Sequence, residues 1–389
     1  MKNIKFMFTL VELVVCIVIT TGCFPNVDTD SKISSTNNSQ NSTIDFPTHI
    51  ENNDIDNLKI DADVILPTNF DTNQKVSIAS AEYRTWDRES IVSEISNGRQ
   101  IEDESYGENT GPNDLFYSYT FDDNANLIFS SDGLFYSTEM AVDFQYAYYF
   151  DSYENYIYDN TLSEMFSKDK INGIEKSDAL SSANKIVSLL NINDVLAEPK
   201  IYSLDAATMN ELQNASDATD KYGNPLEKWG SEQEAYLVVY PVIYRNIPSL
   251  KMNAVSENEL ISSSNVYFIY GRNGLISFYV SGIFNIKNIE QESPIVSPVN
   301  AIENVKNYFN NIIMDSEIDI LLIKLVYIKK CDFENIKDLK VEPVWFIYGK
   351  YKNTLPDSSD SKDILINDKY ITLISAVTGE TIPISSIGR

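Results

Sequence analysis

The predicted fold depends most on two similar stretches, YLVVYPVIY at residues 236–244 and VEPVWFIY at residues 341–348. Both are rich in aromatic and β-branched residues, which favour strands. Each follows a segment with the apolar spacing of a helix, and each precedes a strand–turn–strand pattern. The repetition predicts a diverged duplication, with one unit at residues 172–290 and the other at residues 296–389.

The two helices of this duplication have recognisable first turns and apolar faces. Ser177 is expected to cap the first helix, while Ser297 caps the second and Pro298 occupies its first position. Residues three or four apart share one apolar face in each helix: Ala179, Ala183, Ile186 and Leu190 in the first, and Ile302, Val305, Phe309 and Ile312 in the second. We expect these faces to lie buried against the strands that follow.

Residues 56–168 predict a separate domain that is mostly β. The segment Leu58–Pro67 alternates apolar and polar residues as a strand does. Short turn sequences of Asp, Asn and Gly separate three further strands between residues 115 and 138. One short helix, capped by Asp87 and ended at Asn97-Gly98, completes the domain. The expected fold class is therefore α+β: an N-terminal mostly-β domain followed by two helix-plus-antiparallel-sheet units.

The N-terminus predicts an export signal. Two lysines precede an apolar run at residues 6–19, which ends at Thr20-Thr21-Gly22-Cys23. This arrangement resembles the lipobox of bacterial lipoproteins, although the residue three before the cysteine is not the usual aliphatic one. The resemblance implies that residues 1–22 are a signal peptide and that Cys23 carries lipid. Such an anchor would hold the chain at the outer face of the bacterial cytoplasmic membrane.

A type IV pilin N-terminus is the main alternative for this segment. Phe8–Val15 resembles the apolar run of a pilin, including its glutamate, which is Glu12 here. Met7 stands where prepilin processing requires glycine, and the residues after Pro25 are poor helix formers. We therefore favour the lipoprotein over a pilin, and also over a plain signal peptide or an uncleaved anchor.

Residues 23–55 are expected to form a flexible tether, because they are rich in Ser, Thr and Asn. The chain as a whole is acidic, with 57 Asp and Glu against 30 Lys and Arg and a formal net charge of −27. Such a charge repels nucleic acid and anionic lipid headgroups. Nucleic acid is therefore not expected as a partner, and contact with membrane lipid is expected only through the anchor.

The residue counts are incompatible with several kinds of catalysis. The only histidine, His49, lies in the predicted tether, which argues against a Ser-His-Asp triad, a Cys-His pair and the usual zinc sites. Cys331 is expected to be a small buried side chain beside a strand. The sequence has no glycine-rich phosphate loop, and the acidic residues from Asp357 to Asp368 lack calcium-loop spacing. We therefore assign no catalytic residue, metal or cofactor.

A tyrosine-rich segment near the end of the N-terminal domain is the candidate binding surface. Its tyrosines lie among acidic residues, and large rigid rings bury area at low entropic cost. The residues assigned to partner binding are Tyr146, Tyr148, Tyr149, Tyr153 and Tyr156. A second interpretation stays open, in which alternate rings fill the core of a sheet.

The second half of the chain resembles PepSY-type domains. The residues that carry the resemblance are the helix opening at Ser297, the strand Pro343–Ile347 and a final hairpin at Ala376–Glu380. The tandem arrangement over residues 172–389 is similar to that of the extracytoplasmic YycH and YycI proteins, although those keep a transmembrane helix in place of a lipobox. Leu58–Pro67 is also similar to a segment of uncharacterised lipoproteins of gut Firmicutes.

The resemblance implies a regulatory function without catalysis. YycH and YycI proteins contact a sensor histidine kinase outside the membrane, so a sensor kinase ectodomain or another surface protein is the expected partner. We therefore expect a membrane-anchored surface lipoprotein that binds or regulates an extracytoplasmic partner. Two other classes stay open: a carbohydrate or cell-wall polymer binding module that uses the tyrosines, and a hydrolase with a carboxylate pair.

Overall fold

The computed structural model describes most of the chain after residue 45. The described ranges are residues 46–108, 115–144, 165–216, 227–256, 259–311, 317–332, 335–352, 369–384 and 386–387. Within them the chain forms two large sheets, of eleven and eight strands, and one isolated two-stranded pair of β10 (Ile243–Tyr244) and β11 (Ile247–Pro248).

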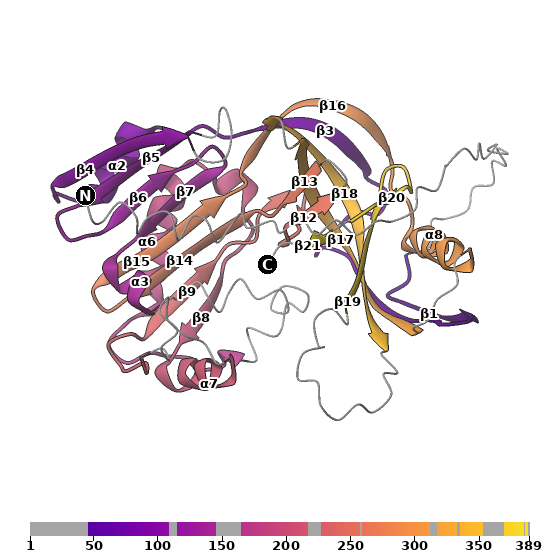
Figure 1. Ribbon diagram of the computed structural model, residues 1–389, viewed down its shortest axis with the longest axis horizontal. Helices are drawn as coiled ribbons and strands as arrows, with labels where there is room; N and C mark the ends of the chain where they lie inside the picture. Colours follow the sequence, from indigo (N-terminus) through magenta and orange to yellow (C-terminus); the bar gives the residue numbers. More distant parts are fainter. Residues whose placement is uncertain are drawn as a thin grey trace. The chain divides into compact units, whose positions relative to one another are not determined.

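The eleven-stranded sheet is built around two long antiparallel strands, β17 (Glu317–Asp332) and β18 (Asn335–Lys352). Strands from both ends of the sequence join this pair, as the indigo and yellow arrows of Figure 1 show. The other members are β1 (His49–Ile55), β2 (Leu58–Ile65), β3 (Lys75–Tyr83), β12 (Ala254–Ser256), β13 (Glu259–Ser262), β16 (Phe284–Pro294), β19 (Lys369–Ser375), β20 (Thr381–Ile382) and β21 (Ser386–Ile387).

Each long strand of this sheet has two different outer neighbours. The first half of β17 pairs in parallel with β2, and its last residues pair with β13. The beginning of β18 pairs with β3, and its second half pairs with β19. β17 has 16 residues and β18 has 18, which is long for strands. Each strand can therefore pair with one outer neighbour near its beginning and with another near its end.

The eight-stranded sheet is antiparallel throughout and has the order β4-β5-β6-β7-β15-β14-β9-β8. It combines a four-stranded meander with strands from later in the chain. Its members are β4 (Ile101–Glu108), β5 (Leu115–Phe121), β6 (Asn126–Phe129), β7 (Gly133–Ser137), β8 (Lys200–Leu204), β9 (Ala235–Val239), β14 (Asn265–Gly271) and β15 (Gly274–Ser281).

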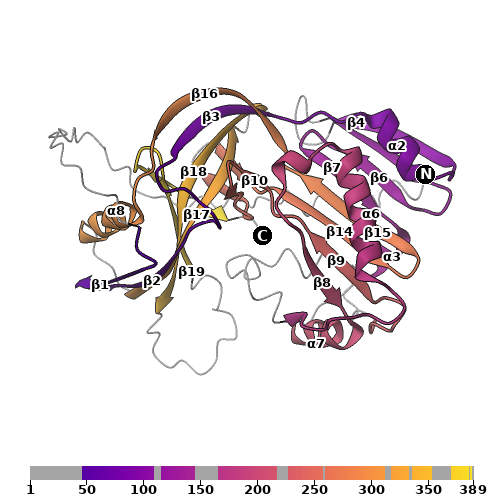
Figure 2. The same ribbon diagram turned by 180° about the vertical axis from the view of Figure 1, so that it is seen from behind.

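Helices pack on both faces of the eight-stranded sheet. Figure 2 shows α2 (Arg88–Ser96) and α6 (Lys176–Leu189) across one face, and their buried side chains share a core with the strands below them. On the opposite face, α3 (Glu139–Phe144) and α7 (Ala206–Ser216) contribute to a second core. A 3-10 turn, η3 (Asn193–Val195), follows α6.

The ends of these helices test the capping predictions. Asp87 caps α2, since its carboxylate accepts the Ser90 N–H at 3.2 Å, and Asn97 ends the helix at a φ of 48°. Both assignments are confirmed. The cap assigned to Ser177 is wrong, because Glu175, two residues earlier, occupies the cap position of α6 and makes no side-chain cap hydrogen bond.

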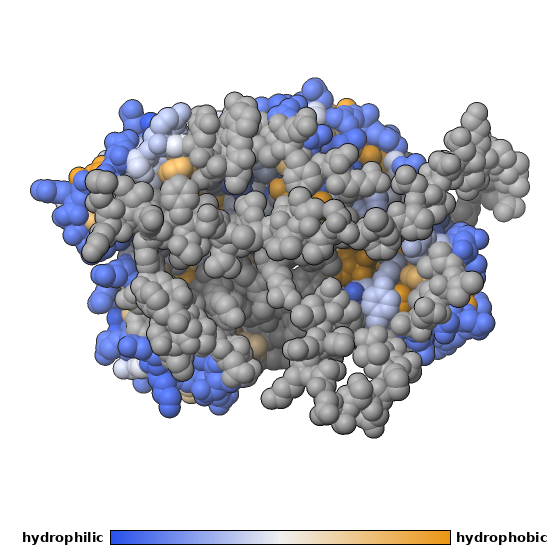
Figure 3. Space-filling model, in the orientation of Figure 1, coloured by the Kyte–Doolittle hydropathy of each residue, from blue (hydrophilic) through white to orange (hydrophobic). Residues whose placement is uncertain are grey.

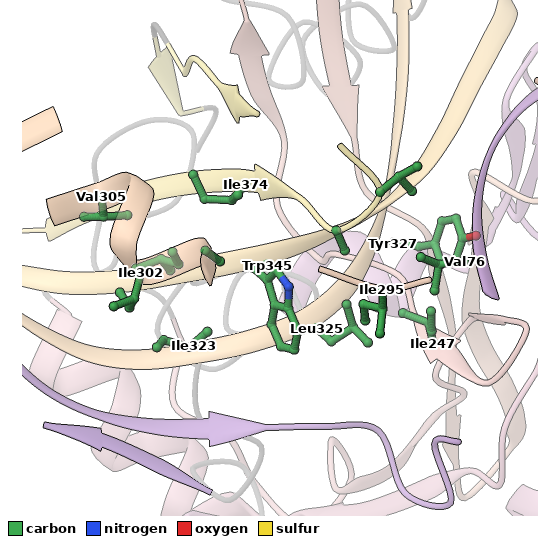
Figure 4. Close-up of a cluster of buried hydrophobic side chains, with 14 of the residues drawn as sticks. Val76, Ile247, Ile295, Ile302, Val305, Ile323, Leu325, Tyr327, Trp345 and Ile374 are labelled. Carbon is green, nitrogen blue, oxygen red and sulfur yellow. The ribbon is translucent and has the colours of Figure 1, made fainter. Parts of the chain in front are cut away.

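The helix α8 (Pro298–Asn310) covers the other large sheet. Ser297 caps it as predicted and accepts the Asn300 N–H at 3.1 Å. Figure 4 shows Ile302 and Val305 of α8 beside Ile323, Trp345 and Ile374 of the strands, with which they share a core. The Trp345 indole is fully buried and donates to the carbonyl of Val296 at 2.8 Å, which satisfies its polar atom.

The predicted fold class is wrong. The chain is mostly β, and residues 172–290 do not form a helix-plus-sheet unit of their own. Their strands β8, β9, β14 and β15 belong to the eight-stranded sheet, whereas β12, β13 and β16 belong to the eleven-stranded sheet. Residues 56–168 are divided in the same way, because β2 and β3 pair with C-terminal strands and β7 pairs with β15. Periodicity identifies an element but not its partner.

The predictions for individual helices and strands agree better with the structure than the predicted fold class does. The expected burial of Ile186, Leu190, Val305 and Phe309 is confirmed. Residues 49–55, which the composition placed in the tether, form β1. Of the described helices, none combines the length and the apolarity that a membrane crossing needs.

Candidate functional site

The residues predicted for lipid attachment and partner binding lie outside the described ranges. They are Cys23, Tyr146, Tyr148, Tyr149, Tyr153 and Tyr156. The acidic segment from Asp357 to Asp368 also lies outside them. Their roles stay predictions, and the site has to be sought among the described residues.

Cys331 is a buried side chain of β17, as expected. It is 3% exposed, and its Sγ lies 3.9 Å from the carbonyl oxygen of Leu260. Burial raises the pKa of the Cys331 thiol to about 11. The thiol is therefore protonated at neutral pH, whereas a cysteine nucleophile needs the thiolate.

His49 forms an exposed ion-pair cluster at the edge strand β1. Its Nδ1 lies 3.0 Å from Oδ1 of Asp63, and its Nε2 lies 3.2 Å from Oδ1 of Asp61. The hydrogen bond to Asp63 raises the pKa of His49. Exposed pairs of this kind contribute little to stability. Within the described ranges, moreover, no three His, Cys, Asp or Glu side chains are grouped so as to hold a metal ion.

Lys329 is a buried ammonium at the connections between the two sheets. It is 1% exposed, and its Nζ donates to the carbonyl of Ser263 at 2.5 Å, the hydroxyl of Ser264 at 2.9 Å and the carbonyl of Gly282 at 3.1 Å. Ser263 and Ser264 link β13 to β14, while Gly282 links β15 to β16. Lys329 therefore binds both of these crossovers.

The geometry makes Lys329 a structural clamp. A lysine ammonium has three hydrogens to donate, and protein acceptors take all of them. A Cβ at Gly282 would overlap Nζ, and the φ of +69° at Gly282 is one that side chains rarely adopt. In its protonated form, Lys329 therefore has no hydrogen left to donate to a ligand.

Arg84, which follows β3, also joins segments that are far apart in the sequence. Its Nη2 donates to Oδ2 of Asp194 at 2.6 Å, and its Nε donates to Oδ1 of Asn285 at 2.9 Å. The hydrogen bond from Arg84 lowers the pKa of Asp194. Like Lys329, Arg84 donates its hydrogen bonds to acceptors of its own chain. Neither cation therefore indicates a binding site for a partner.

The first strand of the eight-stranded sheet offers a different kind of site. β4 ends the strand order, and within the described ranges no strand pairs with its outer side. Five large apolar side chains are exposed among the described residues, and two of them, Ile101 and Tyr106, lie on β4. Elsewhere the described surface is mainly hydrophilic with small apolar patches on the face that Figure 3 shows.

The aromatic side chain on β4 belongs to an organised cluster. Tyr106 is 61% exposed and pairs across the ladder with Tyr117, and the two ring centroids lie 5.0 Å apart. The guanidinium carbon of Arg88, the first residue of α2, lies 3.7 Å from the Tyr117 ring centroid. This is a cation–π contact. We call Arg88, Tyr106 and Tyr117 the edge cluster.

The cluster is held in place by the core behind it. Tyr117 packs against the core that α2 and the meander share, so its ring is fixed before any ligand arrives. Ile91 and Ile95 bury the other end of α2 in that core, which positions Arg88 over the ring. The cluster therefore combines one exposed ring with a rigid base.

Acidic side chains surround this cluster along the strand. Glu102, Asp103 and Glu104 are exposed, and Glu104 also interacts with Arg88 and Tyr119 on the side of the cluster. The strand also pairs regularly with β5 from Asp103 to Glu108, since its one register shift precedes Asp103. β4 thus presents a straight, acidic outer edge.

The other described edge strands are protected against additional pairing. β16 has two register shifts, and its charges form ion pairs such as Lys287–Glu82 at 3.2 Å and Glu290–Lys340 at 3.5 Å. β1 is interrupted by a shift after Asn52. β20 and β21 have two residues each, and three of the five residues of β8 are buried. Bulges, short length and cover are the usual protections of an edge.

β4 was not predicted from the sequence. Its sequence, IEDESYGE, is rich in residues that strands disfavour and has no apolar alternation. A weak signal was present in the Tyr and Ile residues between the end of the α2 helix at Asn97 and the strand at Leu115. An edge strand exposed on its outer side needs few apolar residues, so its pattern resembles that of a loop.

Comparison with known proteins identifies a shared fold. No family model matches this sequence, and no curated protein matches it. The chain is similar to the crystal structure of an uncharacterised protein from Eubacterium rectale ATCC 33656, with a TM-score of 0.58 and 14% sequence identity. The match covers 87% of this chain and 94% of the other. The likeness therefore extends over the fold as a whole, and at this identity it concerns the fold alone.

Proposed function

We propose that this chain is a non-catalytic, membrane-anchored surface lipoprotein that binds an extracytoplasmic protein partner through the edge cluster on β4. The ectodomain of a sensor protein is the partner class that the sequence resemblance favours. The proposal combines the lipobox at Cys23 with a binding site at Arg88, Tyr106 and Tyr117.

One observation carries the proposal: the exposed Tyr106 ring lies against the Tyr117 ring, tilted by 39°, and the Arg88 guanidinium already lies over Tyr117. Tyr and Arg are enriched among the residues that dominate binding energy at protein interfaces. Both rings are pre-ordered by the strand pairing and by the core behind Tyr117, so a partner loses little side-chain entropy there.

A photo-crosslinking experiment in cells tests this function. A photoreactive phenylalanine analogue replaces Tyr106 in the full chain, and a second strain carries it at Tyr308 as the matched control. Tyr308 is exposed to a similar degree, 59%, but lies on α8. We expect a discrete adduct with a membrane protein ectodomain from position 106 and none from position 308.

Affinity measurements with the crosslinked partner then assign the residues. Tyr106→Ala should weaken binding about 30-fold, because loss of a central aromatic contact costs about 2 kcal/mol. Tyr308→Ala should leave the affinity unchanged. Equal adducts from both positions would contradict the proposal, and an adduct with glycan in place of protein would support the carbohydrate-binding alternative.

A further inference from the structure

The outer side of β4 is a backbone template as well as a side-chain surface. In a strand, alternate residues direct their N–H and C=O groups to the same side. Since β5 occupies only one side of β4, about three of the six regularly paired residues from Asp103 to Glu108 present both groups to solvent. Exposed edges of this kind accept an additional strand from a partner.

Charge decides what kind of strand fits. Glu102, Asp103 and Glu104 are consecutive residues of this edge strand, in a chain whose net charge is −27. A second copy of β4 would bring like charges opposite one another, which destabilises strand pairing. A basic segment would neutralise the same residues, and it would approach faster because of the acidic field.

The ladder register defines the side-chain pattern of that segment. Residues paired directly across a ladder lie on one face, and Glu104 and Tyr106 pair with Tyr119 and Tyr117. Glu104 and Tyr106 therefore lie on the α2 face, while Asp103, which pairs with Thr120, lies on the opposite face. A matching strand has an apolar or aromatic residue opposite Tyr106, with basic residues two and three positions away.

From these observations we infer that the partner adds an extended basic segment to β4, as a ninth strand of the eight-stranded sheet. The inference rests on the proposed function and names its binding mode. The other described edges are closed to this mode by shifts, ion pairs, short length or burial, so β4 is the edge at which it is expected.

Hydrogen exchange with two peptides tests the binding mode on the full chain in detergent solution. The probe is the capped peptide Lys-Arg-Thr-Tyr-Thr-Arg-Lys, whose symmetry places basic residues two and three positions from Tyr in either strand direction. The matched control is Lys-Arg-Pro-Tyr-Pro-Arg-Lys, which has the same charge and the same ring. Proline has no N–H and cannot pair in a ladder.

The threonine peptide should slow exchange of the outward amides in residues 103–107 by about tenfold, and it should bind about tenfold more tightly than the proline peptide. Exchange in β16 should not change. Glu104→Lys should abolish the effect, whereas Glu211→Lys on α7, with the same change in net charge, should preserve it.

Equal affinity for the two peptides, or unchanged exchange in β4, would overturn strand addition. This outcome is separable from failure of the proposed function, because crosslinking at position 106 does not depend on the backbone of the peptide. If crosslinking is retained and exchange in β4 does not change, strand addition is contradicted and the proposed function is not. Absence of crosslinking at position 106 would contradict the proposed function, on which the inference of strand addition rests.

Discussion

At the scale of single residues, Lys329 shows how a buried charge ties distant segments together. Its three acceptors lie 66, 65 and 47 residues away in the sequence. Alternation along β17 places Lys329 on the same buried side as Tyr327 and Cys331, while Lys330 points to the other side and pairs with Glu259 and Glu342. Two adjacent lysines in the sequence therefore have different roles, and only the fold distinguishes them.

The clamp leads to a prediction about pH. Burial lowers the pKa of Lys329 from 10.5 to about 7. Between these values the unfolded chain binds the proton that the folded chain has lost, so this residue makes stability rise with pH. Relative to Lys329→Met, the free energy of unfolding of the wild type should rise by up to about 1.4 kcal/mol per pH unit above pH 7.

Urea denaturation at a series of pH values between about 7 and 9.5 measures this difference. Lys340→Met is the control, because Lys340 is a half-exposed lysine that pairs with Glu290 at 3.5 Å. Its pH profile should run parallel to that of the wild type. A parallel profile for Lys329→Met as well would show that the buried ammonium does not titrate in this range.

At the scale of elements, α8 is the helix that the sequence predicted best. Ser297, Pro298 and the apolar spacing predicted its start and its buried face. Both are confirmed for Ile302, Val305 and Phe309, whereas Ile312 lies outside the described residues. These signals are local, since a cap needs only residues three apart and a face needs only residues three or four apart. β4 gave no comparable signal, because its only described partner is β5 and its outer side is polar.

The loss of stability on truncating side chains of α8 to alanine should increase with the burial of the side chain. Phe309 is 5% exposed and packs against Tyr370 with ring centroids 5.4 Å apart, so Phe309→Ala should cost about 3–5 kcal/mol. Ser297→Ala removes the cap and should cost about 1 kcal/mol. The neighbouring Tyr308→Ala changes an exposed ring and should cost no more than about 0.5 kcal/mol. Chemical denaturation measures all three, and a Tyr308 effect as large as that of Phe309 would contradict the packing described.

At the scale of the whole molecule, strand pairing was what the sequence could not supply. β2 at residues 58–65 pairs in parallel with β17 at residues 318–324, and β3 pairs with both β16 and β18. The two stretches that suggested a duplication lie in different sheets, residues 235–239 as β9 in one and residues 335–352 as β18 in the other. Apolar, β-branched composition marks a buried strand but leaves its neighbours undetermined.

The predicted membrane anchor also concerns the whole molecule, because it would act against the charge of the chain. A net charge of −27 repels anionic headgroups, so the protein should stay at a membrane only through covalent lipid. Lipid chains contribute about 0.8 kcal/mol per buried methylene, and stable attachment needs more than one chain or a second signal. The lipobox cysteine predicts such an anchor at Cys23.

Metabolic labelling with a fatty acid tests the anchor. We expect the wild type to carry label and to fractionate with membranes until detergent is added. Cys23→Ala should carry no label and should leave the membrane fraction, because nothing then offsets the repulsion by anionic lipid. Cys16→Ala is the matched control, since Cys16 lies seven residues earlier in the same apolar run, and it should behave as the wild type does. Label that persists in Cys23→Ala, or an unlabelled wild type, would exclude the lipoprotein assignment and reopen the pilin-like alternative.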